Sequence, residues 1–313
     1  VEEESNIVIR IVEMMGGDVN KLKKEKKAVI LAHCYQPVEI DLVADYVGDS
    51  LKLSQVAAET DAEIIVFAGV YFMAQTAKIL SPNKKVLLPQ IDAGCRMADM
   101  INHRQLMEFK TAHPDIPVVC YVNSTAEVKA ECDLCCTSSN AVKVVKNLNA
   151  EKILFLPDTY LGKWVEKQLG NIEVITYPGF CPTHLQIRPA DIEKAREEHP
   201  NALVLAHPEC HMSVSAMADY VGSTTGIMNY AKNSDNKSFI IATEQGVVDR
   251  LKRDYPEKEF IPVKNNIVCP NMKMTSLEDI LEVLKTGKNE ITVDPEIAKR
   301  AVTCIDKMLE ASK

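Results

Sequence analysis

The stretch Val29-Ile-Leu-Ala-His33 is the first of three similar stretches that decide the fold of this chain. The second is Val118-Val-Cys-Tyr121 and the third is Leu203-Val-Leu-Ala-His207. Their last residues are 88 and then 86 positions apart. A repeat of about 87 residues is too long for a solenoid and matches a small domain. The sequence therefore predicts three copies of one unit.

Other features return in the same order within each unit. The residue twelve positions after the first stretch is an aspartate in all three units: Asp45, Asp133 and Asp219. Two further apolar runs follow, as at Ile64–Ala68 and Val86–Leu88 in the first unit. Each unit then delivers one cysteine in a loop-like context, and these three are 86 and 88 residues apart: Cys95, Cys181 and Cys269.

Short apolar runs alternate with segments of helical periodicity, which predicts parallel sheets covered by helices on both faces. In the first unit we expect helices over residues 50–59 and around 73–80. We predict an α/β fold of three homologous αβα domains with small parallel sheets around a pseudo-threefold axis, and an active site in the central cavity. The expected domains are 1–99 with an N-terminal helix, 100–186, and 187–313 with a C-terminal tail.

Ligands bind at the carboxyl ends of the strands in such sheets, where His33, Tyr121 and His207 are expected. Helices are expected to begin at Ser50, Ser138 and Thr224. A helix start leaves backbone N–H groups unpaired and carries a positive dipole end, so it binds anions. Three equivalent starts predict a cavity with three anion subsites.

The composition agrees with a soluble enzyme. The 313 residues carry a net charge of −8, which argues against a nucleic-acid surface. No apolar stretch is long enough to span a membrane, and the acidic start Val1-Glu-Glu-Glu4 does not resemble a signal peptide, so we expect a cytoplasmic protein. Ten cysteines without such a signal favour reduced thiols or a metal site over disulfides.

Two groups of cysteines compete as metal ligands. The C-x2-C pair Cys132 and Cys135 has no partner pair, and the adjacent Cys136 takes the repeat position of Gly48 and Gly222, so we do not expect metal there. Cys95, Cys181 and Cys269 recur at one position of the repeat. Three thiolates favour an iron–sulfur cluster with one open iron, and a three-cysteine zinc site is the alternative.

Longer motifs resemble the quinolinate synthase family over roughly residues 25–310. The motifs occur in the family's order: Ile30-Leu-Ala-His33-Cys-Tyr35-Gln36, Gly48-Asp-Ser50, Phe67-Ala-Gly-Val-Tyr-Phe-Met73, Val119-Cys-Tyr121-Val-Asn123-Ser-Thr125, Cys136-Thr-Ser138-Ser-Asn140, Cys181-Pro-Thr-His184, His207-Pro-Glu209-Cys and Val221-Gly-Ser223-Thr224.

This resemblance implies a [4Fe-4S] cluster held by Cys95, Cys181 and Cys269, and condensation of iminoaspartate (iminosuccinate) with dihydroxyacetone phosphate to quinolinate. The reaction releases phosphate and water on the route to NAD. Transient contact with an aspartate oxidase or dehydrogenase would supply the iminoaspartate. The two carboxylates and the phosphate of the substrates match the three expected anion subsites.

The resemblance also implies residue roles. Glu209 is the general acid–base candidate beside His207, and Tyr35 and Tyr121 are candidate proton donors. The expected substrate-binding residues are His33, Ser50, Tyr121, Val122, Asn123, Ser138, His184, His207, Pro208, Glu209, Ser223 and Thr224. One departure is Cys34, which replaces the asparagine usual in the family and removes an amide from the cavity.

Two other functions fit a cluster held by three repeated domains. One is an enzyme of the diphthamide-synthesis type that cleaves S-adenosylmethionine. The other is a non-enzymatic iron–sulfur sensor, which would need neither Glu209 nor Tyr35.

Overall fold

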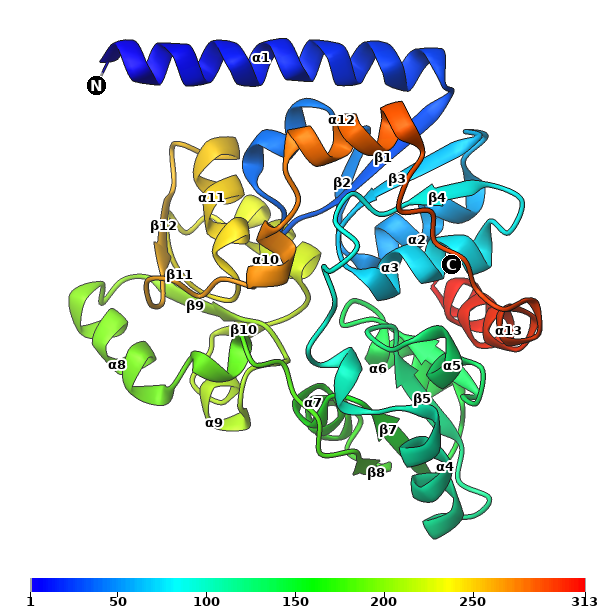
Figure 1. Ribbon diagram of the computed structural model, residues 1–313. Coiled ribbons are helices and arrows are strands. Elements are labelled where there is room, and N and C mark those ends of the chain that lie inside the picture. The colour runs from blue at the N-terminus through cyan, green and yellow to red at the C-terminus, as the bar shows by residue number, and fades with distance from the viewer. Residues whose placement is uncertain (1, 313) are drawn as a thin grey trace. The chain divides into compact units, whose positions relative to one another are not determined.

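Three parallel sheets of four strands each form the frame of the protein (Figure 1). The structure, a computed structural model, describes residues 2–312, with side chains from residue 13. The charged start Val1–Glu4, on which the signal-peptide argument depends, therefore lies outside the residues with described side chains. Within the described residues, no helix combines the length and the apolar character that crossing a bilayer requires.

The strand order is the same in every sheet: β2-β1-β3-β4, β6-β5-β7-β8 and β10-β9-β11-β12. The first sheet contains β1 (Ala28–His33), β2 (Tyr46–Gly48), β3 (Ile64–Ala68) and β4 (Lys85–Leu87). The second contains β5 (Val118–Tyr121), β6 (Leu134–Cys136), β7 (Lys152–Leu156) and β8 (Glu173–Thr176). The third contains β9 (Leu203–Ala206), β10 (Tyr220–Val221), β11 (Ser238–Ala242) and β12 (Glu259–Pro262). The predicted α/β class with three small parallel sheets is confirmed.

The helices follow the strands in the predicted alternation. Those of the first repeat are α1 (Glu2–Glu25), α2 (Ser50–Glu59) and α3 (Tyr71–Leu80). Those of the second are α4 (His103–Ala112), α5 (Ala126–Lys129), α6 (Ala141–Asn147) and α7 (Thr159–Leu169). Those that follow are α8 (Pro189–Glu198), α9 (Met212–Ser215), α10 (Thr224–Asn233), α11 (Gln245–Asp254), α12 (Leu277–Thr286) and α13 (Pro295–Ala311).

The repeated aspartate is a structural residue. Asp45 Oδ2 accepts a hydrogen bond from the backbone N–H of Ile30 at 2.8 Å, and the two other aspartates bind Val118 and Val204 at the same distance. Each aspartate precedes the short strand that pairs with the first strand of its repeat. The carboxylate therefore fixes this edge of each sheet, which accounts for its recurrence without a role in chemistry.

The sequence predicts three apolar runs in each unit. It does not predict the short edge strands β2, β6 and β10. They span only two or three residues, and Tyr46 and Val47 of β2 are exposed. Such segments carry no apolar run that periodicity could detect. Tertiary pairing with the first strand creates them.

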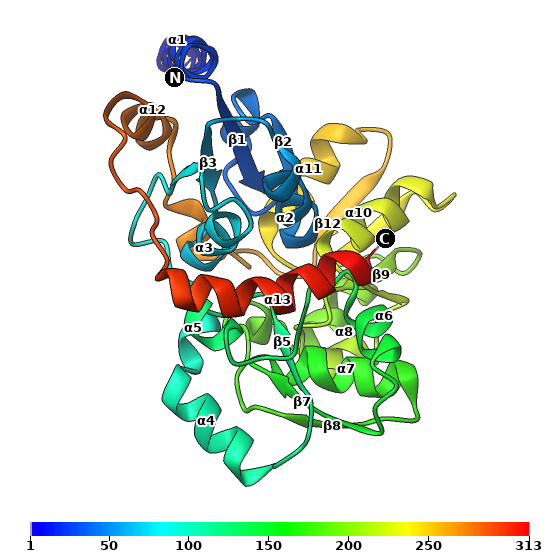
Figure 2. The ribbon, with the colours of Figure 1, turned by 90° about the vertical axis from the view of Figure 1, so that its right-hand side faces the viewer.

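The chain forms two compact units. One comprises Val1–Gly94 with Pro270–Val293, and the other comprises Cys95–Cys269 with Asp294–Lys313. In the first unit, α12 packs against α1 and β3, and Ile280 and Val283 join its buried core. In the second unit, α13 packs against β6 and α5 (Figure 2). The expected boundaries at residues 99 and 186 stay a prediction.

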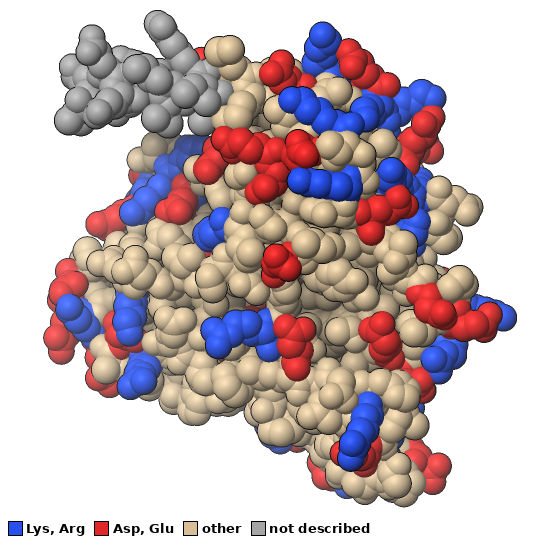
Figure 3. Space-filling view, viewed as in Figure 1, with Lys and Arg blue, Asp and Glu red and all other residues tan. Residues whose placement is uncertain are grey.

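Charged side chains of both signs are mixed over the face drawn in Figure 3. Among the coloured residues, Lys and Arg stand beside Asp and Glu, and no broad area of this face carries one sign alone. The ion pairs of the protein include Lys23–Asp45 and Arg196–Asp219, each with a 2.9 Å contact.

Candidate active site

The first strand of each repeat ends at a residue that the sequence singles out. His33 is the last residue of β1, Tyr121 is the last of β5, and His207 directly follows β9. All three side chains are buried, with 5% or less of their surface exposed. Buried polar side chains at the carboxyl ends of parallel strands are in the position that α/β enzymes use for chemistry.

Glu209 lies at the centre of a hydrogen-bond network in the second unit. The Tyr121 hydroxyl donates to Glu209 Oε1 at 2.6 Å, and His184 Nδ1 lies 2.8 Å from Oε2. Only 5% of Glu209 is exposed. A buried carboxylate needs such partners, because isolated charge is costly to bury. The network thus links Tyr121, at the end of the second repeat's first strand, to Glu209 of the third repeat.

Two stacked imidazole rings flank this carboxylate. The His184 and His207 ring centroids are 4.7 Å apart. His207 Nδ1 accepts from the backbone N–H of Glu209 at 3.3 Å, so its Nε2 carries the proton toward Ser138 Oγ, also at 3.3 Å. His184 Nε2 lies 2.8 Å from Thr243 Oγ1. These contacts fix the orientation of both rings.

The sequence-based prediction does not include Thr243. This residue directly follows β11, the third strand of its repeat along the chain, and only 2% of it is exposed. The available signal is its place after a strand end, because Asp158 lies two residues after the equivalent strand β7. Polar residues after the third strand of a repeat are thus a signal that could have found it.

The surroundings of Glu209 favour its ionised form. Burial acts to raise the pKa of this carboxyl, but the neighbouring His207 and His184 rings and the hydrogen bonds from His184 and Tyr121 together lower it. Glu209 is therefore a carboxylate near neutral pH. In that state it can accept a proton through either hydrogen-bonded partner or hold a cationic group.

Cys95, Cys181 and Cys269 gather beside the same carboxylate. Burial raises the pKa of Cys95 to about 12, and negative charge on Cys269 and Glu209 acts in the same direction. Burial likewise raises the pKa of Cys181, with contributions from Glu209, Cys95 and Cys269. Without a positive partner, Cys95 and Cys181 therefore stay protonated near neutral pH. These electrostatic interactions indicate that the three cysteines lie near one another and near Glu209.

A smaller group of potential metal ligands adjoins these cysteines. One ligand atom each of Cys181, His184 and Glu209 lies within 4.8 Å of the others, and His184 Nδ1 is 3.2 Å from Cys181 Sγ. Sulfur, nitrogen and oxygen donors of this kind suit zinc as well as iron. The described residues therefore offer donors for either metal centre.

Two of the three expected helix starts are correct and one is wrong. Ser50 is the first residue of α2 and Thr224 the first of α10. Ser138 precedes α6, which begins only at Ala141. The reason is a turn in which the Asn140 side chain accepts the backbone N–H of Thr137 at 2.6 Å.

The turn nevertheless lies beside other predicted site residues of the second unit. Ser138 contacts His207, and the adjacent Ser139 hydroxyl lies 2.9 Å from Ser223 Oγ. Ser223 caps α10 by accepting the backbone N–H of Gly226. The hydroxyl-rich segments of the second and third repeats are therefore neighbours.

Asn123 offers an open acceptor next to Tyr121. Its Oδ1 is buried and has no hydrogen-bond partner within the described part of the chain. Val122 and Pro208, the other predicted binding residues of these motifs, are both buried. A buried amide oxygen left unpaired costs free energy, and a ligand that donates a hydrogen bond would remove that cost.

The predicted residues of the first repeat belong to the other compact unit. His33 Nδ1 accepts the backbone N–H of Tyr35 at 3.1 Å, and their rings meet edge to face at 4.6 Å. Lys273 donates to the backbone carbonyl of Tyr35. Cys34 is buried, with 3% exposed. These contacts pre-organise His33 and Tyr35 within their own unit.

The C-x2-C pair belongs to a different thiol group. Cys135 Sγ lies 3.1 Å from Cys304 of α13, and Cys120 makes contacts with Cys132 and Cys135. Among the described residues, neither this group nor Cys95, Cys181 and Cys269 has three sulfur atoms within 4.8 Å of one another. These thiols pack the second sheet against α13.

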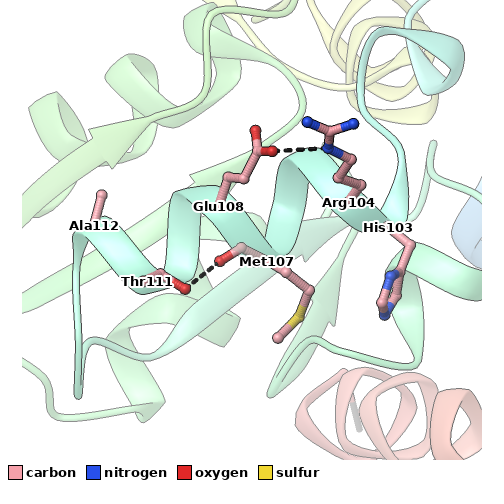
Figure 4. Close-up of a pocket in the computed structure, with 6 residues that line it drawn as sticks. All are labelled: His103, Arg104, Met107, Glu108, Thr111 and Ala112. Carbon is pink, nitrogen blue, oxygen red and sulfur yellow. Dashed lines mark hydrogen bonds and ion pairs between the residues drawn. The ribbon is translucent and has the colours of Figure 1, made fainter.

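A groove along α4 contains none of the predicted site residues. It is lined by His103, Arg104, Met107, Glu108, Thr111 and Ala112, all from one helix (Figure 4). Arg104 and Glu108 form an exposed ion pair at 2.9 Å across it. The groove lacks cysteines and buried polar groups, so the network around Glu209 is the better candidate for chemistry.

The network, the three cysteines and the repeat agree with one family. The sequence model of the family described as Quinolinate synthetase A protein matches residues 17–310. The chain belongs to the quinolinate synthase family. A quinolinate synthase of Alkaliphilus metalliredigens is 52% identical over 95% of this chain and 98% of its own length. Those of Clostridium kluyveri and Thermodesulfovibrio yellowstonii are 51% and 47% identical, over 94% and 93% of this chain and 97% and 96% of their own lengths. This is a family of enzymes.

Proposed function

We propose that this chain condenses iminoaspartate with dihydroxyacetone phosphate to quinolinate, with release of phosphate and water, in NAD biosynthesis. We further propose that it works in the cytoplasm and holds a [4Fe-4S] cluster through Cys95, Cys181 and Cys269. The observation that carries the proposal is the buried Glu209, bound to Tyr121 and His184 beside these three cysteines, in a chain that matches the family over residues 17–310.

The donor set fits the cluster. Burial raises the pKa of Cys95 and of Cys181, and negative charge on Cys269 and Glu209 acts in the same direction for both, so a strongly positive centre would stabilise their thiolates. Three ligands leave one iron open, and an open iron supplies a Lewis acid for a departing hydroxyl. The zinc alternative shares these cysteines and is separated from the cluster by metal and sulfide content.

The polar residues can bind the substrates by charge and hydrogen bonding. The backbone N–H groups at the starts of α2 and α10 suit carboxylate or phosphate oxygens. Ser138 and Ser223 add hydroxyl donors, and Asn123 Oδ1 can accept a hydrogen bond from a ligand amine or hydroxyl. His33 is a further proposed binding residue, and Tyr35 is a proposed proton donor.

Glu209, Tyr121 and His184 can move the protons that dehydration and ring closure release. Glu209 is a carboxylate at neutral pH, and the Tyr121 hydroxyl at 2.6 Å can pass a proton to Oε1. The bond from His184 Nδ1 orients Oε2, while Thr243 holds the opposite ring nitrogen. His207 lies beside them, with its Nε2 proton directed at Ser138.

The decisive experiment is anaerobic purification followed by iron and sulfide analysis and a quinolinate assay with both substrates. We expect about four irons and four sulfides per chain, and quinolinate formation that needs both substrates. Zinc without sulfide would contradict the cluster. Reductive cleavage of S-adenosylmethionine without quinolinate formation would support the diphthamide-type alternative, and a cluster without either activity would support the sensor.

A further inference from the structure

One backbone hydrogen bond recurs in all three repeats next to the cysteine. The first residue of the last helix before the cysteine (α3, α7 or α11) donates its N–H to the carbonyl two residues before the cysteine. The three pairs are Tyr71 to Ala93, Thr159 to Gly179 and Gln245 to Ile267, each at 2.8 Å. Every cysteine loop is therefore tied to the N-terminus of α3, α7 or α11.

The residue that caps these helices differs between the repeats. Asp158 caps α7 and Glu244 caps α11, and neither side chain has any exposed surface. Val70 takes the position before α3 and makes no side-chain cap. Two of the three cysteine loops thus adjoin a buried carboxylate and one adjoins an apolar side chain.

The carboxylate of Glu244 binds two backbone N–H groups at once. Oε1 accepts from Cys269 at 3.2 Å, while Oε2 accepts from Gly246 at 2.6 Å. An amide of the same shape has only one acceptor oxygen, so glutamine could satisfy only one of these donors. The glutamate therefore joins the backbone of Cys269 directly to the first turn of α11.

Asp158 stands in the equivalent place of the second repeat. Its Oδ1 accepts the N–H of Leu161 at 2.6 Å, and the backbone N–H of Cys181 is also directed at this carboxylate. A serine or asparagine would suffice to cap the helix. Burial and the charge of Glu209 raise the pKa of Asp158, and its carboxyl group has a second oxygen that can serve the cysteine loop besides the oxygen that caps the helix.

We infer that Glu244 and Asp158 are positioning residues that hold the Cys269 and Cys181 backbones ready for metal, whereas the Cys95 loop has no capping carboxylate and its Gly94 carbonyl accepts a hydrogen bond from the Asn271 side chain. The inference rests on the proposed cluster. Interactions that orient metal ligands typically change metal affinity about 10- to 100-fold when they are removed. The two capping carboxylates thus extend the site beyond the groups that touch iron or substrate.

The test compares Glu244→Ala, Glu244→Gln and Asp158→Ala with the control variant Asp294→Ala in the full chain. Asp294 caps α13 by accepting the N–H groups of Glu296 and Ile297, and it adjoins no cysteine. In the reconstituted enzymes, we expect iron loss to a chelator to be about 10- to 100-fold faster for Glu244→Ala and for Asp158→Ala. Asp294→Ala should lose iron at the parent rate even if its stability falls equally.

A second readout needs no cluster. In the metal-free protein, hydrogen–deuterium exchange of the segment around Cys269 should be about tenfold faster or more in Glu244→Ala, because its amide loses a hydrogen bond to a charged group. Glu244→Gln keeps the side-chain volume and one acceptor, and should fall between Glu244→Ala and the parent. It serves as the test if the alanine variant does not fold.

The outcomes separate this inference from the proposed function. Parent-like exchange and iron loss in both Glu244 variants, or equal iron loss in Asp294→Ala, would overturn the positioning role while leaving the cluster intact. A parent protein that binds no iron would overturn the cluster, and the exchange measurement would still report whether Glu244 holds the Cys269 loop.

Discussion

The hydroxyl of Tyr121 donates a 2.6 Å hydrogen bond to Oε1 of Glu209, across 88 residues of sequence. Tyr121 ends the first strand of the second repeat, and Glu209 follows the first strand of the third. The contact joins equivalent ends of two sheets.

Glu209→Gln should lower turnover by about 10²- to 10⁴-fold, the usual contribution of general acid–base catalysis. The amide keeps the shape but not the basicity, and it offers one acceptor where Tyr121 and His184 approach two oxygens. Cluster content and substrate binding should stay at the parent level. Steady-state kinetics and cluster absorbance with both substrates measure these effects. If turnover stays near the parent rate, Glu209 is not the general acid–base, and Tyr35 or His207 becomes the candidate.

Alanine at Cys95, Cys181 or Cys269 should abolish the cluster's charge-transfer absorbance, because each residue is a proposed ligand. The matched control is the triple serine variant at Cys132, Cys135 and Cys136, which are sulfur-bearing but belong to another group. It should retain about four irons per chain. A triple variant that folds but purifies without iron would refute the assignment.

Ser50→Ala and Thr224→Ala should each weaken substrate binding by about 1–3 kcal/mol, the contribution of a hydrogen bond to a charged group. Ser138→Ala should do the same through its hydroxyl, although it does not begin a helix. Titration calorimetry with each substrate alone measures the change, and far-UV circular dichroism checks the fold. Normal binding of both substrates by two of these variants would exclude the three-anion arrangement.

Glu131→Gln should destabilise the protein at pH 7 by about 0.5–1 kcal/mol, the range of a partly buried ion pair. Burial acts to raise the pKa of Glu131, but its bonds to Arg300 and His103 lower it overall. The pair's contribution is present above the unfolded pKa of about 4.3 and is lost as the pH falls through the lower folded value.

The difference between Glu131→Gln and the parent should therefore shrink below about pH 4. Denaturant unfolding at several pH values measures it. Glu108→Gln is the control, because Glu108 and Arg104 form an ion pair whose side chains are 63% and 88% exposed. If both variants lose equal stability, the Glu131–Arg300 contact does not secure α13.

The sequence by itself determined the repeat, the α/β class and the position of His33, Tyr121 and His207 at strand ends. These are local properties, because an apolar run of four to six residues followed by a helical pattern specifies a strand and its partner helix. The same repeat singled out Cys95, Cys181 and Cys269, since equivalent positions of equivalent units have equivalent surroundings.

Tertiary structure alone decided which side chains touch. The short edge strands exist only because β1, β5 and β9 pair with them, and the Asn140 turn moved the start of α6 away from Ser138. Only the contacts of Thr243 with His184 and of Glu244 with Cys269 identify these two residues as part of the site. Periodicity specifies a residue's place in its own element, whereas a hydrogen bond between residues far apart in sequence depends on how those elements pack.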